Sequence, residues 1–410
     1  MKNKSFLILF FFIDLQSKTE IDYGGYIRLD TFCDQRQMVA DDNGVTPFYP
    51  APIECDAQCG DINSRGDFGM SSEVSTLYVK TKTELDNVTL FGHIENDFTG
   101  PVYLGTMYIR YAYLKAVWER FLMVIGYAKF PFVEVINPHT VGWDGGNPIA
   151  PWSYQPQIRL CYKPHDIQFL VSPYVQFNYA ATGPEGEIPT YAQNSMTPGI
   201  YSSLEYMTDK THIGIGFNME RILPSLSTTT TSTTSPERTY ASNETLTSFL
   251  GTIYAKIKTA TTKTQAQVLV GQNGFDLSLL GGYAVKCMNP VSGKRSYTNV
   301  NFASGFIDFD WKRYQTLIPG FFIGYAKNLG TRESIYLDSE GKPIFYGFDE
   351  NIDAVFHFSP RIWSKFNDIE LGFEAAFTTA WYGNMNCKAK MPSTYHVSNL
   401  RFLIVSIYRF

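Results

Sequence analysis

The sequence predicts an all-β fold: a single transmembrane antiparallel β-barrel of about 16 or 18 strands, with short periplasmic turns and long outer loops. Three observations predict it. From residue 20 onward, segments of about ten residues alternate between apolar and polar side chains. Very short connections alternate with long polar ones, and the last strand ends in an aromatic residue. A barrel strand turns only one face to lipid, so only every second residue needs to be apolar.

The composition supports a membrane barrel and excludes several other classes of protein. Aromatic residues make up 16% of the 410 residues and charged residues 18%, which excludes a disordered chain. The net charge of −5 provides no basic surface for a nucleic-acid backbone, so we expect no nucleic-acid partner. The longest apolar run, from Phe6 to Ile13, is too short to cross a bilayer as a helix. The aromatic excess fits two interfacial girdles around a barrel.

The start of the chain is typical of a secretory signal peptide. Lys2 and Lys4 precede the apolar run, as in the basic and apolar regions of such signals. No small-residue cleavage motif follows, and a buried strand is the alternative interpretation of the run. We expect a signal peptide at 1–20 and one barrel domain at 21–410, located in the bacterial outer membrane.

The spacing of strands and turns gives the strand count. Strands of about ten residues, with one short and one long connection per hairpin, divide the mature chain into roughly 16 to 18 strands. We expect two-residue connections at Asp209-Lys210 and at Phe275-Asp276, the second leading into a strand at 277–287. The long connections are 34–72, 131–155, 181–199 and 223–246. No internal repeat marks several smaller domains.

Two of the long connections have a distinctive composition. Residues 131–156 are rich in proline and contain Trp143 and Trp152, which would be poorly placed in water. We interpret this segment as a constriction loop that folds into the lumen; an outward surface loop is the alternative. Residues 227–236 are almost entirely Thr and Ser, which indicates a mobile outer loop, with a linker between two domains as the alternative.

The last strand carries an aromatic signal at its end. It presents one apolar face, interrupted only by Ser406 and formed by Leu400, Phe402, Ile404, Tyr408 and Phe410. A terminal aromatic on an alternating strand resembles the assembly signal of outer-membrane proteins, so we expect the barrel-assembly machinery to recognise Tyr408 and Phe410. This strand must also pair with the first one, because closure removes both sheet edges. A soluble edge strand ending in Phe is the alternative.

Ionisable side chains on the lumen face are the candidates for selectivity, because a water-filled pore accepts charge and lipid does not. The candidate cations are Arg28, Lys80, Lys82, Arg110 and Arg159. Strand alternation supports all of them except Arg110, whose face also carries Tyr108, Ala112 and Leu114. Opposed by Asp30, Glu95 and Asp97, they would set a transverse field that steers small ions. Ordinary ion pairs that brace the wall are the alternative.

A metal or acid–base site is a weaker interpretation of His93, Glu95 and Asp97, which share one strand face. Same-face neighbours on a strand lie roughly 6.5 Å apart, too far to converge on one ion without a second strand. We therefore interpret all three as pore lining, and we expect neither a metal nor a cofactor. No catalytic or nucleotide-binding sequence motif occurs in the chain.

Several segments resemble the DcaP-like family of outer-membrane porins and their uncharacterised porin-like relatives. They are Gly25-Tyr26-Ile27-Arg28-Leu29-Asp30, Ile109-Arg110-Tyr111-Ala112-Tyr113-Leu114-Lys115, Ile125-Gly126-Tyr127, Gln157-Ile158-Arg159-Leu160, and Gly324-Tyr325-Ala326-Lys327-Asn328-Leu329-Gly330. The long helical N-terminal extension of some members is absent, and Tyr127-Ala128-Lys129-Phe130 replaces their Gln-Thr-Trp-like run. The resemblance implies a homotrimeric porin in outer-membrane lipid, for small and often anionic organic solutes.

These observations predict a porin-like channel for the passive diffusion of small hydrophilic solutes, with anionic solutes implied by the resemblance. One alternative is a non-conducting outer-membrane adhesin or structural barrel. The other is an outer-membrane hydrolase, which would need a Ser or Asp nucleophile paired with one of the six histidines.

Overall fold

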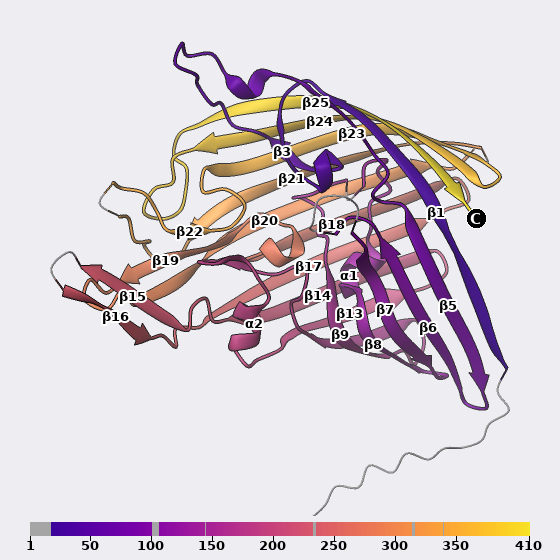
Figure 1. Cartoon of the computed structure of the whole chain (residues 1–410). Coiled ribbons are helices and arrows are strands. Elements are labelled where there is room, and N and C mark those ends of the chain that lie inside the picture. The colour runs from indigo at the N-terminus through magenta and orange to yellow at the C-terminus, as the bar shows by residue number, and fades with distance from the viewer. Residues whose placement is uncertain (1–17, 101–105, 144, 233–234, 314–315, 339) are drawn as a thin grey trace, which may run out of the picture.

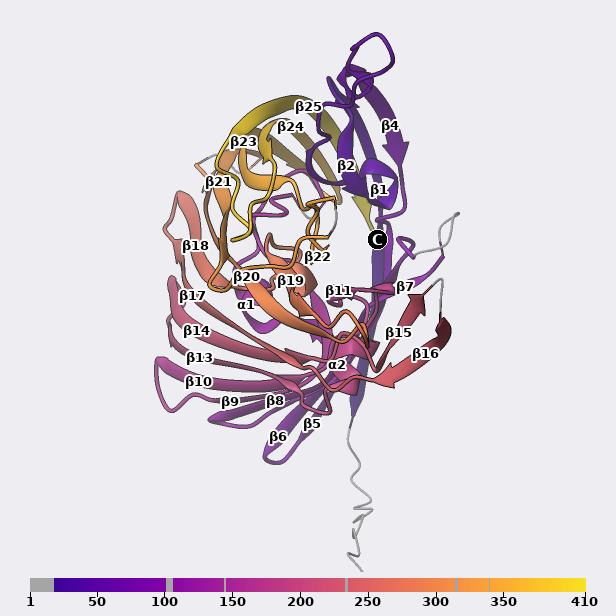
Figure 2. The ribbon, with the colours of Figure 1, turned by 90° about the vertical axis from the view of Figure 1, so that its left-hand side faces the viewer.

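The chain forms a closed antiparallel barrel of 16 strands (Figures 1 and 2). The computed structural model describes residues 18–100, 106–143, 145–232, 235–313, 316–338 and 340–410. Neighbouring barrel strands are hydrogen-bonded in sequence order, and the last pairs with the first. The barrel strands are β1 (Thr19–Asp34), β5 (Thr76–Leu85), β6 (Val88–Asp97), β7 (Tyr108–Val117), β8 (Phe121–Lys129), β9 (Tyr154–Tyr162), β10 (Ile167–Tyr174), β13 (Gly199–Met207), β14 (Thr211–Ile222), β17 (Leu246–Lys258), β18 (Thr262–Gln272), β20 (Arg295–Trp311), β21 (Leu317–Thr331), β23 (Ile352–Phe366), β24 (Ile369–Gly383) and β25 (Thr394–Arg409).

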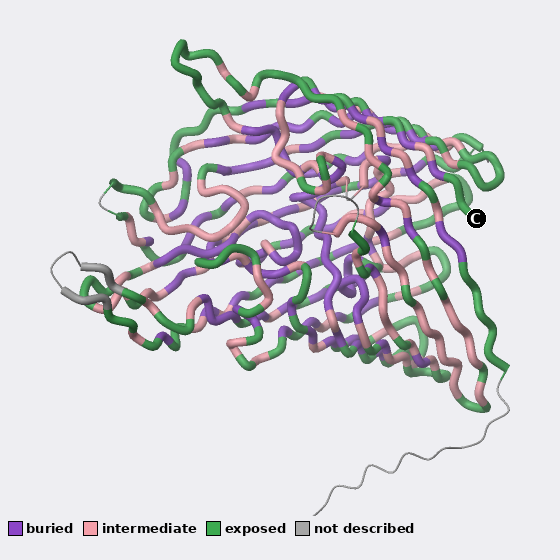
Figure 3. The backbone as a smooth tube through the Cα atoms, viewed as in Figure 1, coloured by how far each residue is buried: buried purple, intermediate pink, exposed green. Residues whose placement is uncertain are grey.

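Strand alternation gives the barrel an apolar outer face and a polar lumen, as Figure 3 shows by the regular change of burial along the strands. On β14, Ile215 and Phe217 are exposed on the outside, whereas Asn218 is buried on the inside. The last strand follows the same pattern, with Ile404 and Phe410 exposed. The lipid-facing surface therefore comes from every second residue, as the sequence predicts.

The seam between β1 and β25 closes the barrel at the chain ends. Residues from Tyr26, opposite Arg409, to Asp34, opposite Arg401, are paired across it. Gly25 and the terminal Phe410 exchange two backbone hydrogen bonds of 3.1 and 3.2 Å. A side chain at Gly25 would lie 2.2 Å from the backbone oxygen of Thr76, so this close approach requires glycine.

The two ends of the barrel differ in their connections. The short turns gather at the end where the C-terminus lies, which we call the inner end, and the long loops lie at the opposite, outer end (Figure 1). The outer loops contain short elements, which are β2 (Met38–Asp41), η1 (Asp42–Gly44), β3 (Thr46–Pro50), η2 (Ile62–Ser64), β4 (Asp67–Ser71), α1 (Pro131–Val135), β11 (Thr182–Gly183), β12 (Gly186–Glu187), α2 (Thr190–Asn194), β15 (Ser227–Ser232), β16 (Ser235–Ala241), η3 (Phe275–Leu277), β19 (Gly282–Met288) and β22 (Phe345–Tyr346). No helix in the described part of the chain is long and apolar enough to span a membrane.

One predicted hairpin is wrong. The sequence predicts a turn at Phe275-Asp276 and a strand at 277–287, but β18 ends at Gln272 and pairs directly with β20. Residues between them form η3 and the short strand β19 at the outer end of the barrel. The apolar residues Leu277, Leu279 and Leu280 that suggested a strand are fully buried in the core instead of facing lipid.

The structure describes two other predicted segments only in part. Most of residues 227–236 belong to the β15–β16 hairpin, with 233–234 outside the described residues, and the mobility of this segment stays a prediction. The signal peptide at 1–20 falls largely on residues 1–17, which also lie outside the described residues. The first barrel strand begins at Thr19.

Candidate pore constriction

The loop between β8 and β9, residues 130–153, runs through the lumen and is called here the lumen loop. Its first turn, α1, lies inside the ring of strands (Figure 2). Phe130 and Phe132 are fully buried, and both rings contact Tyr201 of β13 edge-on, with centroids 5.4 and 5.3 Å apart. Phe130 also meets Tyr174 of β10 at 5.0 Å. Burial of these rings holds the start of the loop against the barrel wall.

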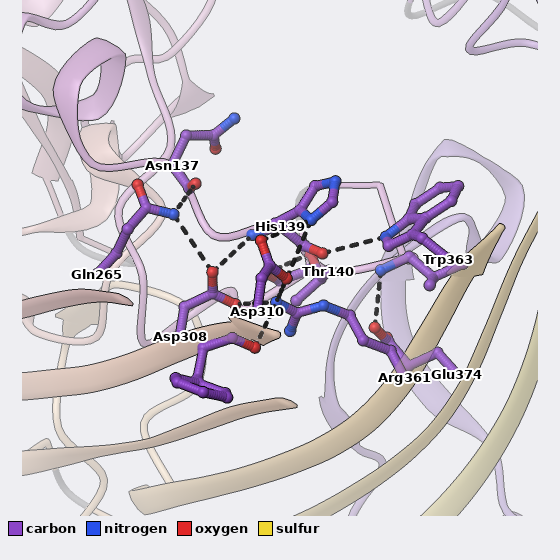
Figure 4. Close-up of polar contacts among 12 residues, drawn as sticks. Asn137, His139, Thr140, Gln265, Asp308, Asp310, Arg361, Trp363 and Glu374 are labelled. Atoms are coloured by element: carbon purple, nitrogen blue, oxygen red, sulfur yellow. Dashed lines mark hydrogen bonds and ion pairs between the residues drawn. The ribbon is translucent and has the colours of Figure 1, made fainter. Parts of the chain in front are cut away.

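Polar contacts hold the middle of the lumen loop across the lumen (Figure 4). Gln265 of β18 donates to the Asn137 carbonyl at 2.8 Å. The backbone N–H of His139 donates to Asp308 at 3.1 Å, and its ring nitrogen Nδ1 lies 3.0 Å from Asp310, both on β20. Trp363 of β23 donates to the His139 carbonyl at 3.3 Å. These three backbone groups of the loop thus find partners on three different strands.

A buried cation organises this anchor. The Arg361 side chain is 0% exposed and lies 2.7 Å from Asp308 and 2.8 Å from Asp310. Glu374 of β24 accepts from the Val141 N–H at 2.7 Å, and Arg28 of β1 donates to the Val141 carbonyl at 2.8 Å. Side chains far away in sequence therefore attach the loop to β18, β20, β23, β24 and β1.

A β-bulge on β7 places Arg110 in the lumen. Glu95 pairs with Tyr111 and Asn96 pairs with Ile109, so Arg110 is the extra residue on its strand. The bulge resets the alternation, because Ile109 and Leu114 are both exposed on the outside while Arg110 is 5% exposed. The bulge therefore turns Arg110 toward the lumen, although the even-numbered residues that follow it on β7 face outward.

Arg110 lies between two cavities of the lumen, against the lumen loop. Its guanidinium forms an ion pair of 2.9 Å with Asp97 and stacks on Trp143, with 4.1 Å between the carbon Cζ and the ring centroid. Glu95 approaches its Nε at 3.5 Å, and Tyr154 is hydrogen-bonded to its Nη2. Glu95 and Asp97 therefore neutralise Arg110, one of the cations predicted to set a transverse field that steers small ions.

Two cavities meet at Arg110 and the lumen loop. The outer one, about 510 Å³, lies among the outer loops, and the inner one, about 480 Å³, lies on the other side of the lumen loop. Both are lined by Arg110, Trp143 and Trp152, so these three residues separate the two halves of the lumen. Both volumes are in the range that accepts a small organic molecule.

The outer cavity is acidic. Arg110 is its one cationic lining residue, against five carboxyl groups from Asp41, Asp42, Glu73, Asp97 and Glu187. Burial raises the pKa of Asp42 to about 6, with the Thr46 hydroxyl opposing the shift. Glu187 is partly exposed to the cavity. The protein around its carboxyl group still excludes enough water to raise its pKa to about 7. Both groups are ionised above these values and neutral below them.

The inner cavity has a balanced lining. Lys80 and Lys129 contribute cations beside Arg110, and Glu95 and Glu134 contribute carboxyl groups. The Lys129 ammonium lies 4.0 Å from the Trp152 ring centroid. No group of three or more His, Cys, Asp or Glu side chains is arranged to hold a metal ion within the ranges that the structure describes.

The structure brings only some of the predicted site residues together. His93, Glu95, Asp97 and Arg110 form one cluster, in which His93 lies 3.2 Å from Glu95. Lys80 lines the same inner cavity and lies over the Tyr78 ring at 3.9 Å.

The other predicted cations lie apart, each beside a carboxylate. Arg28 forms a bidentate pair with Asp30, at 2.7 and 2.6 Å. Arg159 contacts Glu134 at 2.5 Å, and Lys82 contacts the exposed Glu84 at 2.5 Å near the inner end. In the structure, Tyr408 on β25 and Phe410, which follows the end of β25, are both exposed.

Sequence reasoning missed Asp42, Glu187 and Lys129. Asp42 and Glu187 lie in irregular outer loops, where no alternation indicates which side chains face the lumen. Lys129 is the last residue of β8, beside the lumen loop. Its place in Tyr127-Ala128-Lys129-Phe130, which departs from the family pattern, was the available signal.

The sequence matches no protein-family model and no curated protein. Solved structures match over nearly the whole chain. The outer-membrane channel DcaP of Acinetobacter baumannii is 14% identical with a TM-score of 0.64, covering 96% of this chain and 97% of that one. The trimer form of OmpT of Vibrio cholerae is 10% identical with a TM-score of 0.56, covering 96% and 99%. An anion-selective porin from Comamonas acidovorans is 8% identical with a TM-score of 0.54, covering 96% and 100%.

At sequence identities this low, similarity to solved structures shows only that the fold is shared. The chain has the fold of outer-membrane porins, and the resemblance to DcaP-like porins is confirmed at this level. A closed barrel with an apolar outer face is suited to a bilayer, because closure satisfies every strand edge and the outer face buries apolar side chains in lipid. The architecture is therefore that of the barrels found in outer membranes.

Proposed function

We propose that this protein is a DcaP-like porin, a passive diffusion channel for small hydrophilic solutes. The observation that carries the proposal is the meeting of two polar cavities at Arg110, Trp143 and Trp152, with a loop held across the lumen between them. Charged and polar groups that line a lumen support the passage of hydrated solutes. The porin fold of the structural neighbours supports the same role.

The test is conductance in planar lipid bilayers. Purified full-length protein should produce stepwise single-channel currents. Absence of any step after refolding by several protocols would contradict the proposal and favour a non-conducting adhesin or structural barrel.

The charge of the preferred solute follows from the pairing of the lumen arginines. Arg28, Arg110 and Arg159 each contact a carboxylate, so they present little free positive charge. Together with the acidic outer cavity, this favours small cations over anions at the outer mouth. The anionic preference implied by family resemblance remains an untested prediction.

The candidate selectivity residues can be tested by substitution. Replacing Arg28 and Arg159 by Gln frees the partner carboxylates Asp30 and Glu134, so the reversal potential in a salt gradient should move toward cations. Lys342→Ala removes a positive charge from an exposed outer-loop pair and is the matched control. An unchanged reversal potential in the double variant would show that these arginines do not set selectivity.

We further propose a homotrimer without catalytic activity. The trimer form of the OmpT neighbour, which shares this fold, supports the oligomer. The lumen histidines His93, His139 and His212 contact carboxylates, and within the described residues no serine hydroxyl is hydrogen-bonded to any of these rings, as a Ser nucleophile with a His base would require. Light scattering of the detergent-solubilised protein should give the mass of three chains, and a monomer mass would contradict the trimer.

A further inference from the structure

The outer cavity holds carboxyl groups that the protein itself leaves without a cation. Of the five, Asp97 is paired, because it lies 2.9 Å from Arg110. Within the part of the chain that the structure describes, no Lys, Arg or His forms an ion pair with the other four, which belong to Asp41, Asp42, Glu73 and Glu187. A cation that enters the cavity therefore finds carboxylates that are free to pair with it.

Three phenylalanine rings on the same cavity form a group that we call the phenylalanine cluster. The Phe348 ring lies between those of Phe48 and Phe275, with ring centroids 5.0 and 4.7 Å apart. The three residues come from three separate outer loops, and all of them line the cavity. Phe275 and Phe348 are only partly buried, so the cluster presents aromatic surface to whatever enters.

No cation of the protein covers the phenylalanine cluster, in contrast to the tryptophans of the cavity. Arg110 stacks on Trp143 at 4.1 Å, and the Lys129 ammonium lies 4.0 Å from the centroid of the Trp152 ring. Among the described residues, no Lys or Arg lies over a ring of the cluster. The faces of these rings attract positive charge and are left available for a ligand.

A buried amide on the cavity wall also lacks a partner. Asn147 lines the outer cavity and is only 4% exposed, yet its side chain forms no hydrogen bond with any described residue. A buried polar group without a partner costs roughly 1–3 kcal/mol. A ligand with a hydrogen-bond donor would satisfy the amide oxygen.

Hydrogen bonds join the elements that carry these groups. The Thr46 hydroxyl donates to the Asp42 carboxylate at 2.8 Å, and Thr46 lies on β3 with Phe48. The Trp152 N–H donates to the Leu277 carbonyl at 2.9 Å, which joins the lumen loop to η3, the element that carries Phe275. Charge and aromatic surface are thus held on neighbouring elements of one cavity.

The lining fits a ligand that has both a positive charge and an aromatic body. A bare metal ion would leave the rings unused, and a neutral aromatic molecule would leave the carboxylates unused. We propose that the outer cavity binds one aromatic primary ammonium ion. Its ring packs on the phenylalanine cluster, and its ammonium group donates to the free carboxylates and to the Asn147 amide oxygen. This names a solute class for the proposed channel, although binding itself does not require conduction.

The direct test is binding of phenethylammonium by the full-length protein in a non-ionic detergent. Calorimetric titration should show one bound ion per chain. Ethylammonium lacks the ring and phenethyl alcohol lacks the charge, so each should bind at least about tenfold more weakly. Equal affinity for either of these would show a plain cation site or a plain apolar site, and would overturn the proposal. Absence of saturable phenethylammonium binding at millimolar concentration would overturn it as well.

Substitutions in the cavity separate the two parts of the site. Phe348→Leu keeps an apolar side chain but removes the aromatic face, so phenethylammonium should bind about fivefold more weakly and ethylammonium should be unaffected. The matched control is Phe68→Leu, at an exposed ring of β4 that does not line the cavity. An equal loss of affinity in both variants, or no loss in Phe348→Leu, would overturn the role of the cluster.

Asn147→Leu tests the amide with little risk to the fold, because the side chain it replaces is of similar size and has no hydrogen bond to lose. Phenethylammonium should bind about tenfold more weakly to this variant, and phenethyl alcohol should bind as it does to the wild type. Unchanged phenethylammonium affinity would overturn the place of Asn147 in the site.

Binding and conductance are separate measurements. Stepwise currents from a protein that does not bind phenethylammonium would overturn this site and leave the proposed channel standing. Phenethylammonium binding by a protein that gives no currents would support the site and contradict the channel.

Discussion

The two cavities of the lumen are nearly equal in volume but differ in charge. The outer one is lined by five carboxyl groups and a single cation, whereas the inner one is lined by Lys80, Arg110 and Lys129 against two carboxyl groups. The inner lining comes largely from strand faces, and much of the outer lining comes from loops. The strand faces therefore give the inner cavity cations and carboxyl groups in nearly equal number, whereas the outer loops make the outer cavity acidic.

Arg110 and the lumen loop lie between the two cavities. Arg110 belongs to both cavities, but Asp97 and Glu95 hold it in place and offset its charge. Screening in about 0.1 M salt limits charge effects to about 10 Å, so each cavity acts mainly on ions within it. An ion that enters from outside therefore meets the acidic region first.

The largest expected effect comes from breaking the anchor of the lumen loop that separates the cavities. Arg361→Leu leaves Asp308 and Asp310 buried without their cation, which should lower the free energy of unfolding by about 3–5 kcal/mol. Urea unfolding in lipid vesicles measures this change. Lys365→Ala is the control, because its exposed pair with Glu370 should be worth less than about 1 kcal/mol. An equal loss of unfolding free energy in the two variants would show that Arg361 does not anchor the lumen loop.

The next effect concerns the charge of the outer cavity alone. Asp42→Asn combined with Glu187→Gln removes two of its five carboxylates, so the cation-to-anion permeability ratio should fall about twofold. Reversal potentials in a salt gradient measure the ratio. Glu340→Gln, on an exposed outer loop, should leave it unchanged. A shift in the control as large as in the double variant would assign the effect to general surface charge.

Acidification should reproduce part of that change without mutation. Because the pKa of Asp42 is raised to about 6 and that of Glu187 to about 7, both carboxylates become protonated as the pH falls from about 8 to about 5. The cation preference should therefore decrease over this range. The Asp42→Asn and Glu187→Gln double variant should show a smaller pH dependence, and an equal dependence would place the titrating groups elsewhere.

The smallest effect is expected at Lys82, a predicted pore-lining residue. Its side chain is 41% exposed and pairs with the exposed Glu84 near the inner end, outside both cavities. Lys82→Gln should change neither single-channel conductance nor reversal potential by a measurable amount. A clear shift of the reversal potential would show that Lys82 acts on permeating ions although it lies outside both cavities.

Much of the barrel could be predicted from local sequence, and much of the site could not. Alternation along residues 88–98 correctly places His93, Glu95 and Asp97 on the lumen face, because side-chain direction in a strand depends only on position. The same rule fails at Arg110, where a bulge shifts the register against the neighbouring strand. It fails again at Leu277 to Leu280, because an apolar run is equally suited to a lipid-facing strand and to a buried core.

The sequence by itself determined the all-β class, the lipid face and the alternation of short and long connections, since these follow from period-two patterning and turn residues. Only the tertiary structure decided the path of the lumen loop and the partners of each lumen charge. Arg361 and His139, which meet on the carboxylates of β20, are separated by more than 200 residues in sequence. Local propensity carries no information about such pairs, because burial and charge balance are properties of the closed barrel.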